Sequence, residues 1–472
     1  MYVSDLALAD FRNYKREVVS LQPGITTLTG ENGQGKTNFV EAISYLATLA
    51  SHRVSTDNAL IRQGATAGVI QAKVFHGDSP TTVEVEIYGG RANRARINRG
   101  AAKPADLVGI IRVVLFAPED LELVQGDPAT RRHFLDDLMV QLRPRLGGIK
   151  AEYNKVLQQR AAVLRHASGQ FKRAAAVDHA MIDVFDDQLI RLGAQIVAAR
   201  AEIVSRLRPF VEDFYRQVSG SPSLARIDYK ANLNRGFFSL PGPERISENP
   251  QLQAEIEVND NALRDVAGAA ERMRALLAER REQEIERGIN LVGPQRDDLQ
   301  LSLGTLPAKG YASHGESWSF ALALRLAEWQ VLRADESGEW ADDGEPLLIL
   351  DDVFAELDSR RRERLAKIVS QAGQVLVTAA VGDDLPESLT GQRLWVQAGV
   401  IVTPPSSFDS PDGPDFLAPQ APISDNSVAV PGQAAEVPAA DGVEESADET
   451  EVSADGAAEP AAQKVWRADD AE

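Results

Sequence analysis

The segment Gly30–Thr37 restricts the possible folds of this chain more than any other feature of its sequence. It reads Gly-Glu-Asn-Gly-Gln-Gly-Lys-Thr and fits the phosphate-binding pattern G-x-x-x-x-G-K-[ST]. The preceding residues 24–29 predict a short strand, and residues 38–50 carry apolar side chains at helical spacing. Small residues let backbone N–H groups close around phosphates, and the helix N-terminus adds its dipole. Strand, turn and helix together predict an α/β nucleotide-binding domain.

The residues of this loop and its flanks are expected to bind ATP. The Lys36 ammonium would reach the β- and γ-phosphates, and the Thr37 hydroxyl would bind Mg²⁺. The side chain of Arg12 is a further candidate for contact with the nucleotide. The predicted ATP-binding residues are Gly30, Glu31, Asn32, Gly33, Gln34, Gly35, Lys36, Thr37, Asn38 and Arg12.

An apolar run that ends in two carboxylates, Pro346–Asp352, supports the same prediction from far along the chain. A run without polar alternation is typical of a central parallel strand that is covered on both faces. An Asp at its carboxyl end would lie beside the phosphate loop and hold Mg²⁺, directly or through water. Alone, the run could also be a strand that ends in acidic turn residues. Together with the phosphate loop it favours a metal site.

The net charge of −20 is concentrated in the C-terminal tail, residues 403–472. The tail has 9 Asp and 7 Glu against Lys464 and Arg467, a net charge of −14, so residues 1–402 carry only −6. With 9 of the 24 Pro residues and few aromatics, the tail cannot bury enough apolar surface to offset its ordering entropy. We expect it to be disordered. Residues 464–467 at its end are either a short docking peptide or a solvated end without function.

Composition and the first residues favour a cytoplasmic protein. The chain has no Cys, which excludes disulfides and thiolate zinc sites. The N-terminal residues lack a basic segment followed by an apolar core, so we expect no signal peptide. No apolar run approaches the roughly 18 residues of a membrane helix, so we expect no membrane partner.

The spacing of apolar residues divides the chain into four predicted parts. Strands are expected at 70–88, 108–116, 290–303, 375–379 and 394–396. The middle is mostly helical, and Met181–Val218 and Leu252–Arg287 each read as one long amphipathic stretch. The predicted domains are an N-terminal half of an ATPase lobe (1–143), a helical lobe (144–288), the C-terminal half of the ATPase lobe (289–402) and the acidic tail (403–472).

More than three hundred residues separate the phosphate loop from the paired carboxylates. Such a gap, filled by helices, is the layout of the ABC and chromosome-maintenance (SMC) type of ATPase head. Ser313, Gly315 and Glu316 open a predicted helix, where small residues and the helix dipole form a second anion site. In such ATPases this signature site meets the γ-phosphate held by a partner subunit. Asp358 lies in the turn expected to contact the opposing subunit.

The sequence resembles the RecF family of bacterial recombination mediators. The matching residues run in order through nearly all of 1–402, and as a set they are highly specific. They are 11–14, 30–38 with 41–42, 116–121, 131–132 with 134–136, 293–298, and 350–353 with 356–358. Gln295 departs from the family, which usually has His there, and Glu316 stands where many members have Gln. A carboxylate at position 316 would repel a γ-phosphate unless it points away.

The resemblance implies an α/β fold of the ABC/SMC ATPase-head type, with a mixed sheet, an inserted helical lobe and a disordered acidic tail. It implies a weak, DNA-stimulated ATPase that forms an ATP-dependent homodimer in recombinational and replication-gap repair. It also implies recombinase loading, the SOS response, and the RecO and RecR mediators as partners. A nucleotide-binding scaffold without significant hydrolysis is the alternative. A transporter-type subunit is a further one, although no His follows the strand at 375–378.

Asp351 and Asp352 are the predicted catalytic residues, and Thr37 and Asp351 the predicted metal ligands. In faster relatives a Glu at the position of Asp352 polarises the attacking water. Because Asp is one methylene shorter, we expect poorer positioning of the water and slow hydrolysis.

Two basic clusters are candidates for contact with DNA phosphates, although charge runs are often solvated faces. One cluster lies around an expected hairpin and consists of Arg91, Arg94, Arg96, Arg99 and Lys103. The other follows Asp358 and consists of Arg360, Arg361, Arg362 and Arg364. Neither has interleaved aromatics, which favours double-stranded DNA or a single/double-strand junction. Arg131 and Arg132 are a further basic pair, which we expect to bind Asp136 and Asp137.

Overall fold

The computed structural model describes residues 1–402 apart from 174–178, 235–248, 336–343 and 381–384. The described residues belong to one compact unit, 1–413. The predictions for the tail, including the possible docking peptide at 464–467, lie outside the described residues. The predicted divisions after residues 143 and 288 stay predictions.

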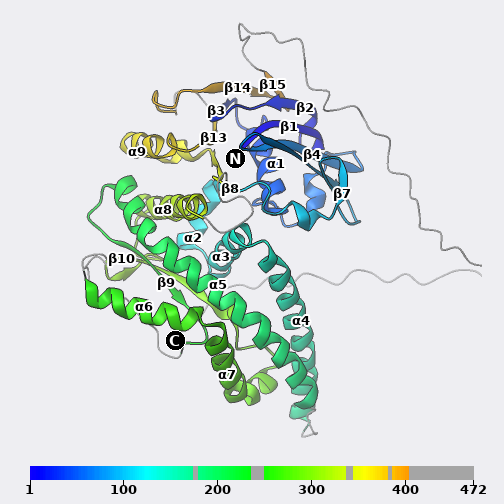
Figure 1. The fold of residues 1–472 in the computed structure, drawn as a ribbon, viewed down its shortest axis with the longest axis vertical. Helices are drawn as coiled ribbons and strands as arrows, with labels where there is room; N and C mark the ends of the chain where they lie inside the picture. Colours follow the sequence, from blue (N-terminus) through cyan, green and yellow to red (C-terminus); the bar gives the residue numbers. More distant parts are fainter. Residues whose placement is uncertain (174–178, 235–248, 336–343, 381–384, 403–472) are drawn as a thin grey trace, which may run out of the picture. The chain divides into compact units, whose positions relative to one another are not determined.

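A six-stranded, mainly parallel sheet has the strand order β15-β14-β3-β13-β12-β8 (Figure 1). Its strands are β3 (Gly24–Thr29), β8 (Val113–Phe116), β12 (Leu347–Asp351), β13 (Gln374–Ala379), β14 (Gln392–Gln397) and β15 (Val400–Val402). Strands β13, β12 and β8, the last of them at one edge of the sheet, are buried along their whole length, and the unbroken apolar run before Asp351 predicted this for β12. The register pairs Asp351 with Thr378, and Ala379 with Thr29. The end of β12 and the start of the phosphate loop therefore lie at one edge of the sheet.

A second sheet is antiparallel and has the order β2-β1-β4-β5-β6-β7. Its strands are β1 (Tyr2–Phe11), β2 (Tyr14–Ser20), β4 (Ala67–His76), β5 (Ser79–Tyr88), β6 (Arg94–Ile97) and β7 (Gly100–Ala102). In β4 every second residue is buried, the pattern of a strand with one face on a core. Helix α1 (Lys36–Thr48) contacts both sheets, and its residues Phe39 and Ile43 share one core with Ile70 and Ile349. The helix after the phosphate loop is thus fixed from two sides.

Helices and a small sheet form the rest of the described chain (Figure 1). The α-helices are α2 (Leu121–Gln125), α3 (Pro128–Leu142), α4 (Arg145–Lys172), α5 (His179–Ser219), α6 (Pro250–Arg264), α7 (Val266–Arg287), α8 (His314–Arg333) and α9 (Ser359–Val369). The small antiparallel sheet contains β9 (Ala225–Lys230), β10 (Asp298–Leu303) and β11 (Leu306–Pro307). Short 3-10 helices cover Asp57–Leu60, Pro104–Leu107, Pro118–Asp120, Pro294–Arg296 and Val353–Glu356. Because α5 packs against α4, α6, α7 and α8, it organises this part of the molecule.

Three predicted elements differ from the structure in extent. The stretch predicted as one helix from Leu252 breaks at Asp265, whose carboxylate accepts the first backbone N–H groups of α7. This N-cap ends one helix and begins the next. Of the strand predicted at 108–116, only the part that forms β8 is a strand in the structure, because the chain turns at Gly109, where φ is +96°. Of the strand predicted at 290–303, only the part that forms β10 is a strand in the structure, because Pro294 begins a 3-10 helix before β10.

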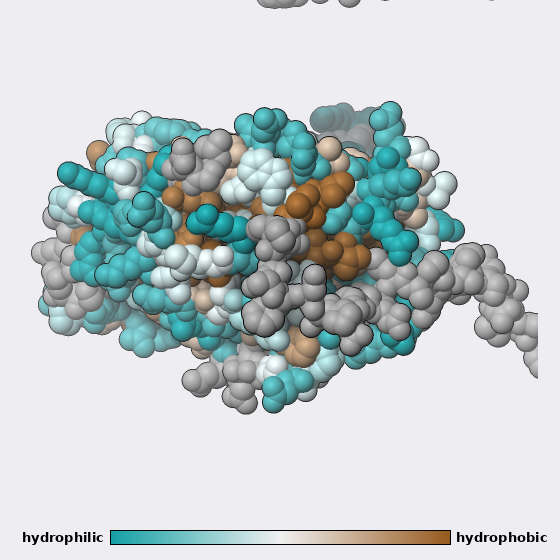
Figure 2. All heavy atoms as spheres, turned by 90° about the horizontal axis from the view of Figure 1, so that it is seen from above, coloured by the Kyte–Doolittle hydropathy of each residue, from teal (hydrophilic) through white to brown (hydrophobic). Residues whose placement is uncertain are grey.

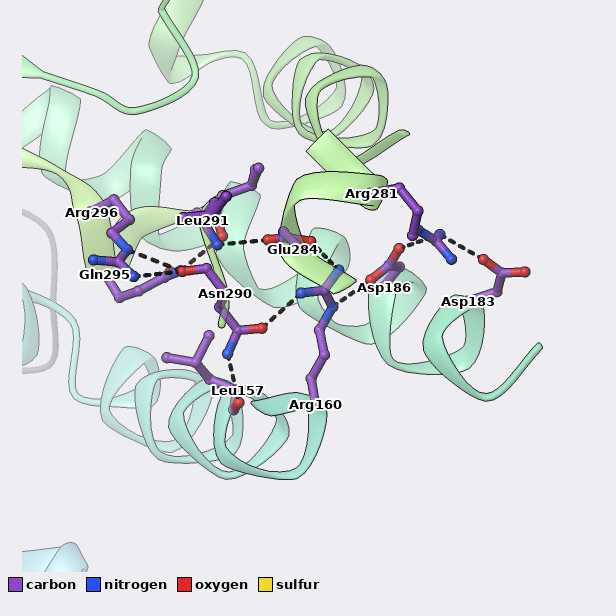
Figure 3. A network of polar contacts seen from close by, with 12 residues as sticks. Leu157, Arg160, Asp183, Asp186, Arg281, Glu284, Asn290, Leu291, Gln295 and Arg296 are labelled. Atoms are coloured by element: carbon purple, nitrogen blue, oxygen red, sulfur yellow. Dashed lines mark hydrogen bonds and ion pairs between the residues drawn. The ribbon is translucent and has the colours of Figure 1, made fainter. Parts of the chain in front are cut away.

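A buried ion-pair network joins α4, α5 and α7 (Figure 3). The fully buried Arg160 donates to Asp186 on α5 and to Glu284 on α7, both at 2.6 Å. A further hydrogen bond of 2.7 Å reaches Asn290, and Arg281 donates to Asp186 at 2.7 Å. A buried charge that loses its partner is costly, so this network fixes how the three helices pack.

The surface near β15 exposes apolar side chains. Val18, Val400 and Val402 lie there, and between 39% and 53% of each residue is exposed. Figure 2, which views the molecule from the side of these strands, shows apolar atoms within a mostly polar face. In the described part of the chain, no helix combines the length and the apolar character needed to cross a bilayer.

Candidate nucleotide site

The phosphate loop runs from the end of β3 into α1, as the sequence predicts, and two of its glycines are required by close contacts. A Cβ on Gly30 would lie 2.2 Å from the backbone oxygen of Val396. A Cβ on Gly35 would lie 2.6 Å from the Asn13 amide nitrogen, and φ at Gly35 is +121°. Both positions are closed to residues with a side chain. The loop is therefore tightly enclosed by β14 and by the turn after β1.

Lys36 lies inside this loop. Only 4% of the residue is exposed, and its ammonium donates to the carbonyl oxygens of Gly30 at 2.9 Å and Glu31 at 3.2 Å. These contacts hold the charge next to the backbone N–H groups of the loop. An anion that enters the loop would meet the ammonium without a large movement of the side chain.

The loop is braced by residues that the sequence did not mark as site residues. The Asn13 amide donates to the Gln34 carbonyl at 2.8 Å, and the Tyr14 hydroxyl donates to the Gly35 carbonyl at 2.9 Å. From the other side, the backbone of Ala398 donates to the Gln34 side chain at 2.6 Å. Asn13 and Tyr14 belong to a segment that matches the RecF family, but only the fold shows that they touch the loop.

Arg12 has a partner of its own in the structure. Its guanidinium donates two hydrogen bonds to the fully buried Glu41, at 2.9 and 2.7 Å, and a third to the Ala59 carbonyl at 3.0 Å. The same residue has a positive φ of 52°. Arg12 thus fixes the first hairpin against α1, and its contact with nucleotide stays a prediction.

Thr37 and Asp351, the predicted metal ligands, lie next to each other. The Thr37 hydroxyl donates to the Asp351 carboxylate at 3.1 Å, and the Thr378 hydroxyl donates to the same oxygen at 2.6 Å. Asp351 is 3% exposed, and this burial raises its pKa to about 6; the hydroxyl of Thr378 lowers the pKa and the charge of Asp352 raises it. A hydroxyl and a carboxylate are hard oxygen ligands that suit Mg²⁺, which usually takes one or two protein ligands together with phosphates. The two side chains therefore fit this metal.

Asp352, the predicted second catalytic carboxylate, follows directly. It adopts a left-handed conformation with φ of 52°, which Asp tolerates better than most residues. Its backbone N–H donates to the Thr378 hydroxyl at 2.9 Å. Thr378 therefore orients both carboxylates, a role that its place at the end of β13 provides and that no local motif indicated.

The signature segment caps helix α8. Glu316 accepts hydrogen bonds from the backbone N–H and the hydroxyl of Ser313, at 2.9 and 2.8 Å, and its own N–H donates to the Ser313 hydroxyl at 3.3 Å. These bonds from Ser313 hold the pKa of Glu316 below its usual value. The carboxylate thus occupies the N-terminus of the helix in the same chain.

Arg361 connects the signature segment with the turn at Asp358. Its guanidinium is so close to Gly315 that a Cβ there would lie 2.7 Å from it. The same guanidinium pairs with Asp358 at 3.1 Å. The structure therefore brings Ser313, Gly315 and Glu316 together with Asp358. Within the described residues, no hydrogen bond or ion pair joins them to the loop 30–37 of the same chain.

The first predicted DNA cluster is partly neutralised. Arg96 forms a short ion pair with Glu84 and a second one with Glu86 at 3.2 Å. Arg91 stacks on the Tyr88 ring, 3.6 Å from its centroid, and the guanidinium of Arg94 is 5.9 Å from the same ring. Arg99 is exposed at the tip of the hairpin. DNA contact at this cluster stays a prediction.

The expected pairing of Arg131 and Arg132 with Asp136 and Asp137 is wrong. Arg131 binds Asp298 with two hydrogen bonds of 2.8 and 3.1 Å, and Arg132 donates to the Asp297 carbonyl at 2.8 Å. Helix α3 packs against β10, which places these partners from far along the chain beside it. Asp136 pairs instead with Arg200 at 2.7 Å and Lys150 at 3.3 Å, and Asp137 pairs with His133 at 3.3 Å.

Gln295 has a structural partner as well. It accepts a short hydrogen bond from the Tyr153 hydroxyl, and its amide donates to the Val292 carbonyl at 2.8 Å. The segments 131–136 and 293–298 match the RecF family, but the sequence indicated no role for them. In the structure they form one network of hydrogen bonds and ion pairs between α3, α4 and β10.

Comparisons with known proteins agree with this architecture. Residues 2–388 match the family model described as RecF/RecN/SMC N terminal domain. The DNA replication and repair protein RecF of Beutenbergia cavernae is 53% identical over 406 residues, which cover 85% of this chain and 99% of that protein. The RecF protein of Streptomyces avermitilis is 47% identical over 403 residues, covering 85% and 99%.

Among solved structures, the recombination mediator protein RecF-ATPrS in the RecFOR pathway has a TM-score of 0.70 at 22% identity. The match covers 85% of this chain and 98% of that one. The RecF-ATP structure of the same pathway gives a TM-score of 0.69. The fold is the RecF fold, in agreement with the predicted α/β head with a mixed sheet.

Proposed function

The chain belongs to the RecF family of DNA replication and repair proteins, and from this membership we propose that it is an ATP-dependent DNA-binding clamp. Its work would be recombinational and replication-gap repair. One observation carries the proposal most directly: Lys36 inside its loop and the Thr37–Asp351 pair lie side by side, as ATP and its metal require.

In the proposed site, backbone N–H groups of 30–37 and the Lys36 ammonium bind the phosphates. Thr37 and Asp351 would hold Mg²⁺, which would supply positive charge to offset the charge of the phosphates. Asp352 orients the attacking water, and Thr378 holds the backbone that carries Asp352. Because an Asp side chain reaches less far than Glu, hydrolysis is slow and the ATP-bound state is long-lived.

A second copy of the chain completes this site in the proposal. Ser313 and Gly315 of one subunit contact the γ-phosphate in the loop of the other, and Asp358 contacts the opposing subunit. The closeness of Ser313, Gly315 and Asp358 around Arg361 supports a single contact surface. ATP then joins two subunits, and hydrolysis releases them.

The relatives supply the setting of the proposal. The solved RecF structures are assigned to the RecFOR pathway, so we propose RecO- and RecR-type mediators as partners. Assistance in recombinase loading and a role in the SOS response belong to the same proposal. The DNA would be double-stranded or a single/double-strand junction.

ATP turnover with and without gapped DNA tests the function, with Lys36→Ala as the reference variant. We expect slow turnover that DNA stimulates and that the substitution abolishes. Turnover that ignores both DNA and the substitution would refute an ATPase at this loop. ATP binding without any turnover above the variant would favour the alternative, a nucleotide-binding scaffold.

A further inference from the structure

Helix α4 concentrates positive charge in a chain that is otherwise acidic. Between Arg145 and Lys172 it carries six Lys and Arg residues and one acidic residue, Glu152, a net charge of +5. The whole chain has a net charge of −20. The neighbouring α3 and α7 have equal numbers of acidic and basic residues. The positive charge of α4 within an acidic chain therefore needs a physical explanation.

Part of this charge lies along one flank of the helix. At about 100° per residue, Lys150, Asn154, Gln158, Arg165 and Lys172 fall within an arc of roughly 80°. The arc contains no carboxylate. Glu152 lies on the opposite flank, where it pairs with Arg191 of α5 at 3.2 Å. Tyr153, Val156 and Leu164 point to the buried side. We call the side chains of the arc the α4 flank.

The basic groups of the α4 flank are largely uncommitted. In the described part of the chain, Arg165 and Lys172 have no hydrogen-bond or ion-pair partner, and Arg165 lies against Gly288 at the end of α7. The basic helix α9 differs, because three of its Arg side chains have fixed partners. Arg361 pairs with Asp358, Arg362 donates to the Leu357 carbonyl, and Arg364 donates to the Val218 carbonyl.

The α4 flank begins at a cavity of about 230 Å³ between α3, α4 and the 3-10 helix Pro294–Arg296. Arg132, Lys150, Asn154 and Gln295 line it together with the buried Arg200. Asp136 is the carboxylate in the lining, and it already binds two cations, Arg200 at 2.7 Å and Lys150 at 3.3 Å. Burial lowers the pKa of Arg132, and the charge of Arg200 lowers it further. The cavity therefore has an excess of positive charge at its mouth.

We propose that this cavity and the α4 flank bind the phosphate backbone of double-stranded DNA. The inference rests on the proposed DNA-binding function and assigns its contact surface. Lys150 and Arg165 are 15 residues apart on the helix, about 22 Å, which corresponds to roughly six base pairs of duplex. Asn154 and Gln158 between them are neutral hydrogen-bond donors for phosphate oxygens. The α4 flank carries no aromatic side chain, so it lacks the stacking platform of single-strand binders.

Two double variants of the same helix test the assignment. Lys150→Gln with Arg165→Gln removes two charges from the α4 flank. Lys155→Gln with Arg173→Gln, where Arg173 is the residue that follows the helix, removes two charges that lie outside the α4 flank and serves as the matched control. Affinity for a blunt 30-base-pair duplex is measured by fluorescence anisotropy over a KCl series, with Mg²⁺ and a non-hydrolysable ATP analogue present.

The flank variant is expected to reduce the slope of log affinity against log salt by about 1.8, since each lost phosphate contact removes about 0.9. That change corresponds to roughly 30-fold weaker binding at 0.15 M salt. The control should stay within twofold of the wild type. ATP binding and melting temperature, measured on both variants, confirm that the proteins are folded.

Equal loss in both variants would overturn the assignment, because it would show a general effect of charge. No loss in the flank variant would overturn it as well. If the wild type itself binds no duplex, the proposed DNA-binding function fails, and this inference fails with it. A second measurement uses the wild type alone: acetylation of lysines should show that DNA protects Lys150 more than Lys155. The reverse order of protection would contradict the proposal.

Discussion

Asp351→Asn should stabilise the nucleotide-free protein while it damages the metal site. The Asp351 carboxylate is 3% exposed, and burial raises its pKa from 3.8 to about 6. A difference of two pKa units corresponds to about 3 kcal/mol of unfavourable free energy for the charged form in the folded state. Asn is nearly isosteric, keeps an oxygen that accepts from Thr37 and Thr378, and carries no charge. Up to about 3 kcal/mol of stability should therefore be gained at pH 8.

The pH dependence gives the sign of this effect. The pKa of Asp351 is higher in the folded state than in the unfolded state. Its carboxyl group therefore destabilises the folded protein least below pH 3.8, and the loss of folding free energy grows until the pH passes about 6. The melting temperature of Asp351→Asn should exceed that of the wild type by a few degrees at pH 8, and by little at pH 4. Asp352→Asn, at a half-buried position, is the control and should change less.

Differential scanning fluorimetry without nucleotide and titration with Mg²⁺-ATP measure the two effects. We expect Asp351→Asn to melt higher and to lose the dependence of ATP binding on Mg²⁺. A melting temperature equal to or below that of the wild type at pH 8 would refute the reasoning from burial. Undiminished dependence on Mg²⁺ would refute the assignment of Asp351 to the metal.

Other contacts give predictions of the same kind. Arg160→Ala leaves two buried carboxylates without their main cation and should lower the free energy of unfolding by about 3–5 kcal/mol. Arg191→Ala breaks an exposed ion pair and should lower it by at most about 1 kcal/mol. Equal values for the two variants in urea denaturation would contradict this. Lys36→Ala should weaken ATP binding about tenfold or more in calorimetry, because the phosphates lose the ammonium that lies inside the loop. Glu316→Gln preserves the cap of α8 but removes its charge, and should tighten ATP-dependent self-association severalfold; weaker association would count against the trans contact of the signature.

The local parts of the fold and the site could be predicted from the sequence. The loop 30–37 and the strand that ends at Asp351 follow short-range rules, namely a spacing of glycines and an unbroken apolar run. The capping of α8 by Ser313 and Glu316 also follows from a four-residue pattern. In each case the residues that determine the structure are close together in the chain.

Contacts between distant segments could not be predicted in the same way. Asn13 and Tyr14 reach the phosphate loop only because β1 and β2 lie beside it. Arg131 finds Asp298 through the packing of α3 on β10, although carboxylates on its own helix are nearer in sequence. Arg96 is neutralised by Glu84 of the neighbouring strand β5. These partners depend on strand register and helix packing, which residue patterns alone do not determine.

The mass of the protein in solution tests the central claim most directly, namely that the loop of one copy and the signature of another enclose the same ATP. Light scattering with Mg²⁺ and a saturating non-hydrolysable ATP analogue should give the mass of two chains of 51.2 kDa each. Without nucleotide the mass should be that of one chain. Ser313→Arg should bind the analogue and stay at the mass of a single chain. A wild-type protein that remains a single chain when saturated with the analogue would contradict the account.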